Sequence, residues 1–380
     1  MSSIHFFSLG SRPADETSSR VQPFGTHWPL ALLAVGLLAT PGCKKEEAPP
    51  ASAPAPAAPK PKAAAPATGT NAVAGGAGTN AAAGVGEAVD LRLKWPVGKR
   101  YLQRIDVVEE NETKTPGVPQ AIPQESVQSL NYTVTVLQER DGGGRELEVE
   151  FAAQKIDSKN SGRPLVTFDS TSDPKGDRTN AVAATLRKLV GLKFHYLTDT
   201  NGRIEKVVGA QEMRTKLLAN VNLQTRGVLT SLLSEDNLKR VITLDLDLPV
   251  NPVKIGDAWP MQRDNPMGQL GTVLITATNA FKGWVEHEKR RCALIEYTGS
   301  LTNKPAVAPV PAGIQINTVV ESGRTSGKSW FDPATGMIID SYSEQEMTMK
   351  ISSAGVNSER KTRKKITVKL IEIGDAPKAN

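Results

Sequence analysis

Hydrophobic and polar residues alternate along most of the chain after about residue 87. In the clearest case, Leu147, Val149 and Phe151 alternate with three glutamates. Apolar residues at every second position share one face of a β-strand. The same period recurs in the segments 91–95, 132–136, 244–248, 347–351 and 366–370. Strands with one apolar and one polar face predict an antiparallel sheet with one buried side.

Two turn signals support this reading. Asn201-Gly202 separates the strand-like segments 194–198 and 204–208, and Asn-Gly is a strong hairpin signal. The segment from Asp332 to Gly336 places Pro and Gly between 328–331 and 337–342, as a turn between two strands requires. Both sites therefore predict β-hairpins.

Helical periodicity occurs only in the middle of the chain. One apolar stripe covers 182–190 after Asp177, a candidate cap, a second covers 213–221, and a third surrounds Gly227. Strands, a helical cluster and strands again predict an α+β fold. We expect a predominantly antiparallel β-sheet, as a half-barrel or as two related β halves, with a central helical insertion.

A short internal echo leaves the domain organisation open. Residues 95–101 and 252–259 each contain Pro-Val followed by Gly and an aromatic residue. Such an echo is the kind of signal that an internal repeat leaves. Residues 88–380 are therefore predicted to form one β-rich globular domain, or two halves at 88–248 and 249–380.

The N-terminal region carries an export signal. About ten apolar residues, Leu30 to Ala39, would span about 15 Å as a helix, half of what a membrane span needs. Small residues and Cys43 follow, and this boundary resembles the bacterial lipobox, although Thr40 stands where Leu is usual. The resemblance implies a lipoprotein-type signal peptide at 1–42 and acylation of Cys43. The alternatives are cleavage near Ala39 without a lipid, and an uncleaved anchor.

Residues 43–87 form a linker between that cysteine and the predicted domain. They are mostly Ala, Pro, Gly, Thr and Asn, a composition that cannot bury enough apolar surface to offset the entropy of the chain. We expect a disordered tether that reaches about 35 Å or more. By resemblance to lipoprotein sorting, Lys44 after Cys43 implies the outer membrane, with the domain facing the periplasm.

The charge pattern offers one candidate contact surface. The net charge of +6 is small for 380 residues, and aromatic residues do not interleave with the basic ones, so no nucleic-acid partner is predicted. The densest basic run leads into the last strand-like segment. It is either a contact for lipid headgroups or another polyanion, or a solvated strand edge. The run comprises Arg360, Lys361, Arg363, Lys364 and Lys365.

Catalytic and metal-binding signals are missing from the sequence. Gly327-Lys328-Ser329 ends like a phosphate loop, but the glycine spacing is wrong and a strand follows. After the signal only His195 and His287 remain, without further ligands at metal-binding spacing. We therefore predict no catalytic residues, no metal and no cofactor. If Cys43 is acylated, Cys292 has no disulfide partner and is expected to be buried.

Three segments carry a resemblance to uncharacterised lipoprotein domains of bacterial envelopes: 256–259, 201–204 and 331–336. More loosely, a sheet with a helical insertion after a lipobox is similar to the lipoprotein-carrier (LolA-like) half-barrels, which hold acyl chains against a concave sheet. From the export signal, the tether, the strand pattern and the missing catalytic signals, we expect a non-enzymatic envelope lipoprotein. It is expected to bind an apolar ligand between sheet and helices or to act as a scaffold, with a lipid or an envelope protein as partner. The alternatives are a periplasmic hydrolase with an unrecognised site and a structural component of an envelope assembly.

Overall fold

The computed structural model describes Gly86 and residues 88–377, apart from 180, 220–225, 227–229, 231–232, 243–247, 268–270, 305–315 and 354. The predicted signal peptide, Cys43 and nearly all of the linker lie outside the described residues, as does most of the predicted strand at 244–248. Among the residues described, no helix has both the length and the apolar character needed to cross a membrane.

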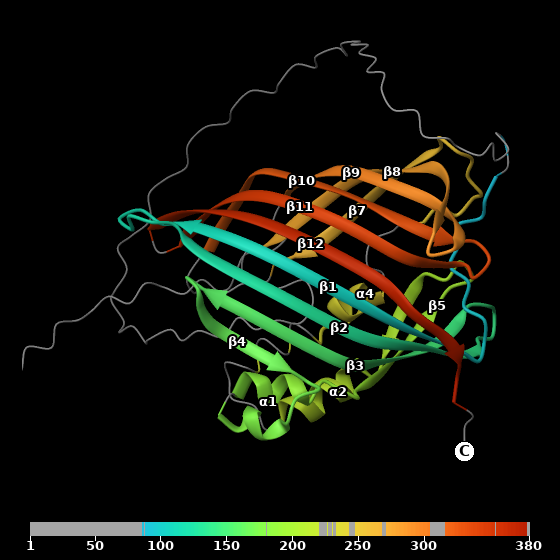
Figure 1. Cartoon of the computed structure of the whole chain (residues 1–380), viewed down its shortest axis with the longest axis horizontal. Helices are drawn as coiled ribbons and strands as arrows, with labels where there is room; N and C mark the ends of the chain where they lie inside the picture. The colour runs from blue at the N-terminus through green and yellow to red at the C-terminus, as the bar shows by residue number, and fades with distance from the viewer. Residues whose placement is uncertain are drawn as a thin grey trace, which may run out of the picture.

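Twelve strands form one antiparallel sheet (Figure 1). They are β1 (Lys99–Lys114), β2 (Ile122–Glu139), β3 (Arg145–Asn160), β4 (Arg163–Asp169), β5 (Lys193–Thr198), β6 (Ile204–Val208), β7 (Ala258–Pro266), β8 (Thr272–His287), β9 (Arg290–Lys304), β10 (Ile316–Asp332), β11 (Met337–Ser353) and β12 (Val356–Asp375). Their order is β6-β5-β3-β2-β1-β12-β11-β10-β9-β8-β7, and β4 pairs with β3.

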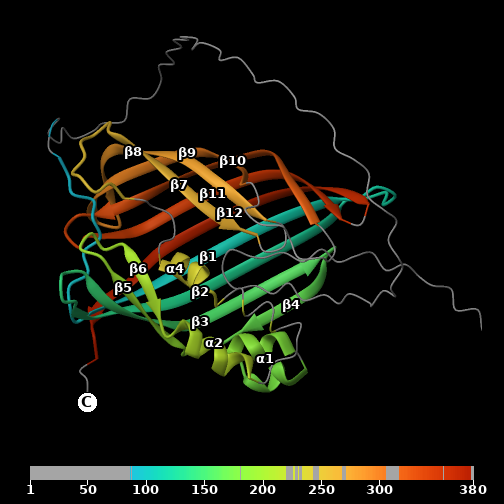
Figure 2. The same ribbon diagram turned by 180° about the vertical axis from the view of Figure 1, so that it is seen from behind.

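The chain starts in the middle of this sheet and returns to it. From β1 it proceeds outward to the edge strand β6, crosses to the opposite edge at β7, and comes back strand by strand until β12 pairs with β1 (Figures 1 and 2). Among the described residues no ladder joins β6 to β7, so the sheet is open. Strands from 88–248 and from 249–380 thus share one sheet, joined at β1 and β12.

The helices are short, and the predicted α+β class is wrong. Strands make up 65% of the described residues and helical residues 10%. The helices are α1 (Ala181–Arg187), α2 (Ala210–Leu218) and α4 (Glu235–Ile242), with a 3-10 helix at Pro174–Thr179. The stripe at 182–190 ends as a helix at Arg187, and Leu189 is buried from the turn that follows. The protein is mainly β, because the first two stripes supply helices of only 7 and 9 residues rather than a helical layer. Most of the third stripe, around Gly227, lies outside the described residues.

The helices fill the space that the sequence predicted as a ligand groove. Leu186, Met213 and Leu238, from three helices, share one buried cluster with Tyr132 and Phe151 of the sheet. The hydroxyl of Tyr196 on β5 donates a hydrogen bond to the carbonyl of Leu238. We call the face of the sheet that carries this cluster the inner face. Each fully buried side chain of this kind contributes about 1.5–3 kcal/mol, so the described helices stabilise the core by packing against the sheet.

Both predicted hairpin turns are confirmed, but the segment at 91–95 is not a strand. Gly202 and Gly336 have φ of 79° and 68°, a region that suits glycine. The Asp332 carboxylate accepts a hydrogen bond from the amide of Ala334 (2.9 Å) and fixes the start of its turn. Residues 91–95 pair with no strand. Their buried side chains, Leu91 and Trp95, instead pack into the apolar clusters of the sheet.

Residues 88–98, here called the strap, lie across one end of the open sheet. Val89 and Val253 exchange two backbone hydrogen bonds, of 2.8 and 2.9 Å. The amide of Lys94 donates to the carbonyl of Gly336 (2.9 Å), and the Nε of Arg145 donates to the carbonyl of Trp95 (3.2 Å). The strap is therefore hydrogen-bonded to both halves of the sheet, 88–248 and 249–380.

The strap contacts the segments that lie just before the two edge strands. Val253 precedes the edge strand β7, whereas Gly202, whose Cα hydrogen faces the Trp95 indole, precedes the edge strand β6. A Cβ on Gly202 would lie 3.2 Å from the Leu93 carbonyl, and one on Gly336 would lie 2.4 Å from the side chain of Lys94. Glycine at both turns thus leaves room for the strap, which spans the gap that the unpaired edges leave.

We predict that Leu91→Ala destabilises the protein by about 2–5 kcal/mol, because Leu91 is fully buried and the truncation leaves a cavity. The matched control is Val97→Ala on the same strap, where the side chain is 49% exposed and the loss should stay within about 0.5 kcal/mol. Urea unfolding of both variants measures the difference. Equal unfolding midpoints would show that the strap contributes no stability.

Candidate functional site

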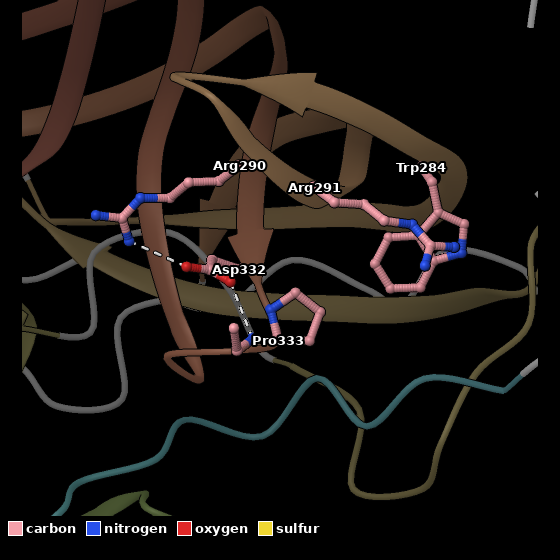
Figure 3. A pocket seen from close by; sticks show the side chains of 6 residues that line it. Trp284, Arg290, Arg291, Asp332 and Pro333 are labelled. Atoms are coloured by element: carbon pink, nitrogen blue, oxygen red, sulfur yellow. Dashed lines mark hydrogen bonds and ion pairs between the residues drawn. The ribbon is translucent and has the colours of Figure 1, made fainter. Parts of the chain in front are cut away.

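A pocket of about 490 Å³ opens at the end of the sheet where the strap lies (Figure 3). The end of β8 supplies Trp284, the start of β9 supplies Arg290 and Arg291, and the turn from β10 to β11 supplies Asp332. Pro333 and Ala334 complete the lining. We call it the rim pocket. It brings two cations and one carboxylate to an aromatic wall.

The two arginines of the rim pocket differ in whether a carboxylate pairs with them. Arg290 Nη1 lies 3.0 Å from the carboxylate of Asp332, which also accepts hydrogen bonds from the Ala334 amide and the Thr335 hydroxyl. The Arg291 guanidinium lies 4.3 Å from the centre of the Trp284 ring, a cation–π contact. Within the described part of the chain it has no ion pair, although Glu286 stands opposite it in the ladder. Arg291 is thus the cation that no carboxylate neutralises.

Beside this pocket, three potential metal ligands come together. Ligand atoms of His287, Glu288 and Asp340 lie within 4.8 Å of one another. His287 Nε2 is 3.1 Å from the Asp340 carboxylate, and its ring stacks on Trp330 with 4.2 Å between the centres. Lys369 binds Glu288 and lowers the pKa of its carboxyl. Since each group already has a partner, we assign no metal to this cluster.

The inner face of β8, β10 and β11 carries a group of buried polar side chains, here called the polar patch: Asn279, Ser329, Ser341 and Ser343. Each is 3% exposed or less. Neither amide atom of Asn279 and none of the three hydroxyls has a hydrogen-bond partner within the described ranges. Buried polar groups are paired in more than about nine cases in ten, so four together are unusual.

Strand register explains how these side chains meet. Asn279 lies opposite Tyr297, Tyr297 opposite Gly327, and Gly327 opposite Ser343, across four neighbouring strands. A Cβ on Gly327 would lie 2.5 Å from the Tyr297 ring, so glycine lets the ring cover β10. Ser329 and Ser341 face each other in the next row. Sequence reasoning missed the patch, because Ser and Asn within strands gave no signal without the register.

Apolar clusters flank the patch along the strands. On the strap side are Phe281, Ile295 and Phe331, and on the other side are Leu301 and Met349. On β8 alone, Val273, Asn279 and Phe281 share the inner face in this order. Along these strands the inner face therefore holds buried, uncharged polar groups between two buried apolar clusters.

The predicted basic run divides between the two faces of β12. Arg360 and Lys364 point to the inner face and are buried, with Lys364 opposite Glu109 on β1. Burial lowers the pKa of Arg360 to about 9, and Glu109 opposes this shift. The other three cations point outward. Each lies within 4.0 Å of a carboxylate: Lys361 of Glu359, Arg363 of Glu346 and Glu110, and Lys365 of Glu344.

The remaining sequence candidates lie apart from one another. Cys292 is free and fully buried, as expected, and burial raises the pKa of its thiol to about 11. His195 on β5 contacts the carboxylate of Glu146 at 2.7 Å. His287 is half-buried, with its ring stacked on Trp330. No sequence motif indicated the rim pocket, since its three segments meet only through the pairing of β8 with β9 and of β9 with β10.

Three solved structures resemble the chain weakly. Lipovitellin, from a study of its lipid–protein interactions, is 14% identical over 76% of this chain, with a TM-score of 0.41, and the chain spans only 26% of it. A protein with a YmcC-like fold from Bacteroides fragilis NCTC 9343 is 11% identical, covering 75% of this chain and 99% of its own, with a TM-score of 0.22. An outer membrane channel from Pseudomonas putida F1 is 10% identical, covering 73% and 97%, with a TM-score of 0.16. These TM-scores are too low to establish a shared fold.

Sequence comparison gives a clearer result. Among curated proteins, none matches the chain. Residues 143–338, just over half of the 380, match a family described as "Family of unknown function (DUF6263)". This range extends from the start of β3 to the start of β11 and includes the rim pocket and two residues of the polar patch. The prediction of an uncharacterised family is confirmed to this extent: the chain belongs to this family of unknown function.

Proposed function

We propose that the chain is a non-enzymatic binding protein of the bacterial cell envelope. Its inner face takes a ligand that combines an apolar body with an uncharged hydrogen-bonding group, such as a hydroxyl, ester or amide. The observation that carries this proposal is the polar patch, whose buried groups have no partners among the described residues.

The cost of those unpaired groups supports a ligand. A buried donor or acceptor without a partner costs about 1–3 kcal/mol, so four such side chains are a large burden for a marginally stable domain. Hydroxyls and a carboxamide both donate and accept hydrogen bonds, and none of the four is charged. A ligand with an uncharged polar group would therefore satisfy them best.

The surroundings of the patch support the apolar part of the ligand. Phe281 and Phe331 lie on one side, and Leu301 and Met349 on the other. About six residues of strand separate Asn279 from Val273, or about 20 Å, which is long enough for an extended acyl chain. The ligand expected from the sequence was apolar and lay between helices and sheet. That space is packed, and the proposed surface lies on the other half of the sheet.

The anchor remains part of the proposal. The apolar segment Leu30 to Ala39 and the small residues before Cys43 support export and acylation, and the 43–87 linker supports a domain that stands off from its membrane. Lys44 favours the outer membrane, with the domain facing the periplasm. The exposed basic residues of β12 are proposed to contact anionic surfaces only as a secondary feature, because carboxylates accompany them.

The alternative functions are a hydrolase, a structural component and a scaffold, and each predicts a different experimental outcome. A hydrolase needs a nucleophile or a base beside a substrate cleft, and Asp332 in the rim pocket is instead held by three donors. A structural component of an envelope assembly would carry no small ligand at all. A scaffold would be recognised by a protein partner that co-purifies with the chain.

Replacing the three patch serines tests the ligand. We predict that Ser329→Ala, Ser341→Ala and Ser343→Ala combined leave the ligand-free protein at least as stable, because unpaired hydroxyls are removed. The same variant should lose most of a co-purifying mass that native mass spectrometry detects on the full chain. Ser300→Ala, on the exposed face of β9, is the matched control and should retain that mass.

The result also separates the alternatives. A co-purifying mass that the triple variant keeps would place the ligand elsewhere. A clean ligand-free mass for the unmodified protein would favour the scaffold reading. A triple variant that unfolds earlier in urea without any ligand would show that the hydroxyls have partners within the chain.

The anchor has a separate test. Inhibiting lipoprotein signal peptidase in a bacterial host should leave the precursor uncut. Cys43→Ser should abolish acyl-chain labelling and leave an uncut precursor in the membrane fraction. Gel mobility, acyl-chain labelling and fractionation measure these outcomes. Normal maturation under inhibition would contradict the lipid anchor without bearing on the polar patch.

A further inference from the structure

We infer that the rim pocket binds the phosphate headgroups of an anionic membrane surface, so that the strap end of the sheet faces the bilayer to which the chain is tethered. The tether itself rests on the proposed function. The affinity of the pocket for anionic lipid does not, and it can be measured without an acyl anchor.

The first support is the charge balance of the pocket. Asp332 is the only carboxylate among the described residues that line it, and its side chain is 6% exposed and bound to Arg290. Arg291 is exposed and has no ion pair in the described part of the chain. Arginine presents planar paired donors that match phosphate oxygens. An anionic group would therefore bind here without displacing an existing partner of Arg291.

The second support is the position of the aromatic ring. Trp284 packs edge-on against Phe281, with 5.6 Å between ring centres, and its face holds the Arg291 guanidinium (Figure 3). This contact aims the cation without neutralising it. Tryptophan is the side chain that most favours the headgroup level of a bilayer, because it has an apolar ring and a polar edge. Ring and cation together suit a lipid headgroup better than a small free anion.

Aliphatic side chains are exposed at the same end. Val250 and Ile255, in the segment that leads into β7, are 46% and 41% exposed. The amide of Gly256 donates to the carbonyl of Phe281, so this segment is fixed beside the strand that carries Trp284. Lys254 between them adds an exposed cation. Exposed aliphatic, aromatic and basic residues together are typical of a surface that enters a membrane interface.

The path of the chain supports the orientation. The predicted anchor at Cys43 and the start of the described fold are separated by the 43–87 linker, and Val89 enters the fold through its pairing with Val253. The tether therefore reaches the sheet at the end that carries the rim pocket. A membrane held by this tether is always within reach of Arg291.

Vesicle co-sedimentation tests the inference with the full chain carrying Cys43→Ser, which removes any acyl contribution. We expect binding to phosphatidylcholine vesicles that contain about a third phosphatidylglycerol, and weaker binding to phosphatidylcholine alone. Arg291→Gln should lower the partition coefficient about fivefold, the usual effect of one cation at an anionic surface. High salt should weaken binding of the unmodified chain, because it screens the interaction.

Two control variants make the outcome specific. Arg163→Gln changes an exposed arginine at the start of β4, on the end of β3 remote from the strap, and should leave the partition coefficient unchanged. Lys365→Gln probes the outward basic residues of β12. A larger loss for Lys365→Gln than for Arg291→Gln would overturn the inference. So would an Arg291→Gln variant that binds as well as the unmodified chain, or binding that millimolar inorganic phosphate abolishes at constant ionic strength.

Discussion

The structure depends on how the strap joins the two edges of an open sheet. An antiparallel sheet that begins and ends at its centre leaves β6 and β7 as unpaired edges on opposite sides. The strap touches the turn before β6 through Trp95 and the residue Val253 before β7. Because Leu91 is fully buried between these contacts, the strap limits how far the edges can separate at this end. We expect the curvature of the sheet, visible in Figures 1 and 2, to depend on that restraint.

The two halves of the inner face differ in the side chains that they bury. Over β1 to β6 the short helices cover an apolar cluster, so burial there serves stability. Buried polar residues also lie on the inner face of β1, but Glu109 and Asn111 are hydrogen-bonded to each other. Over β8 to β11 uncharged polar groups interrupt the apolar surface, which is a poor choice for stability alone. Natural proteins leave polar groups without partners in a core mainly at functional sites. This contrast within one sheet is the physical basis for placing the ligand on the second half.

Strand alternation and turn chemistry predicted much of this fold, and the reasons for the errors are specific. Period-two patterns located β3 and the hairpins at Asn201-Gly202 and Asp332-Gly336, since one buried face and a required turn leave strong local signals. The predicted helical insertion failed because short apolar stripes give the same pattern whether a helix has two turns or five. The residues 91–95 alternate like a strand, yet they pack as a strap whose partners are distant in sequence.

The candidate sites could not be predicted from local sequence patterns, because their residues come from different strands. Asn279, Ser329 and Ser343 become neighbours only through strand register, and Arg291 and Asp332 line one pocket only because β9 pairs with β10. The basic run at 360–365 looked like one patch in the sequence. The period of a strand sends its members to opposite faces, where carboxylates from neighbouring strands meet the outward ones. Sequence order alone does not specify such cross-strand partners.

An experimental structure of the full chain, purified gently from a bacterial host, would show directly whether the inner face holds a ligand. We expect ordered density that belongs to no residue of the chain, within hydrogen-bond distance of Asn279 and of at least one of Ser329, Ser341 and Ser343. That density should continue along the apolar surface towards Leu301 and Met349. Four side chains paired with one another, with ordered water or with another part of the chain, and no further density, would contradict a ligand site on the inner face.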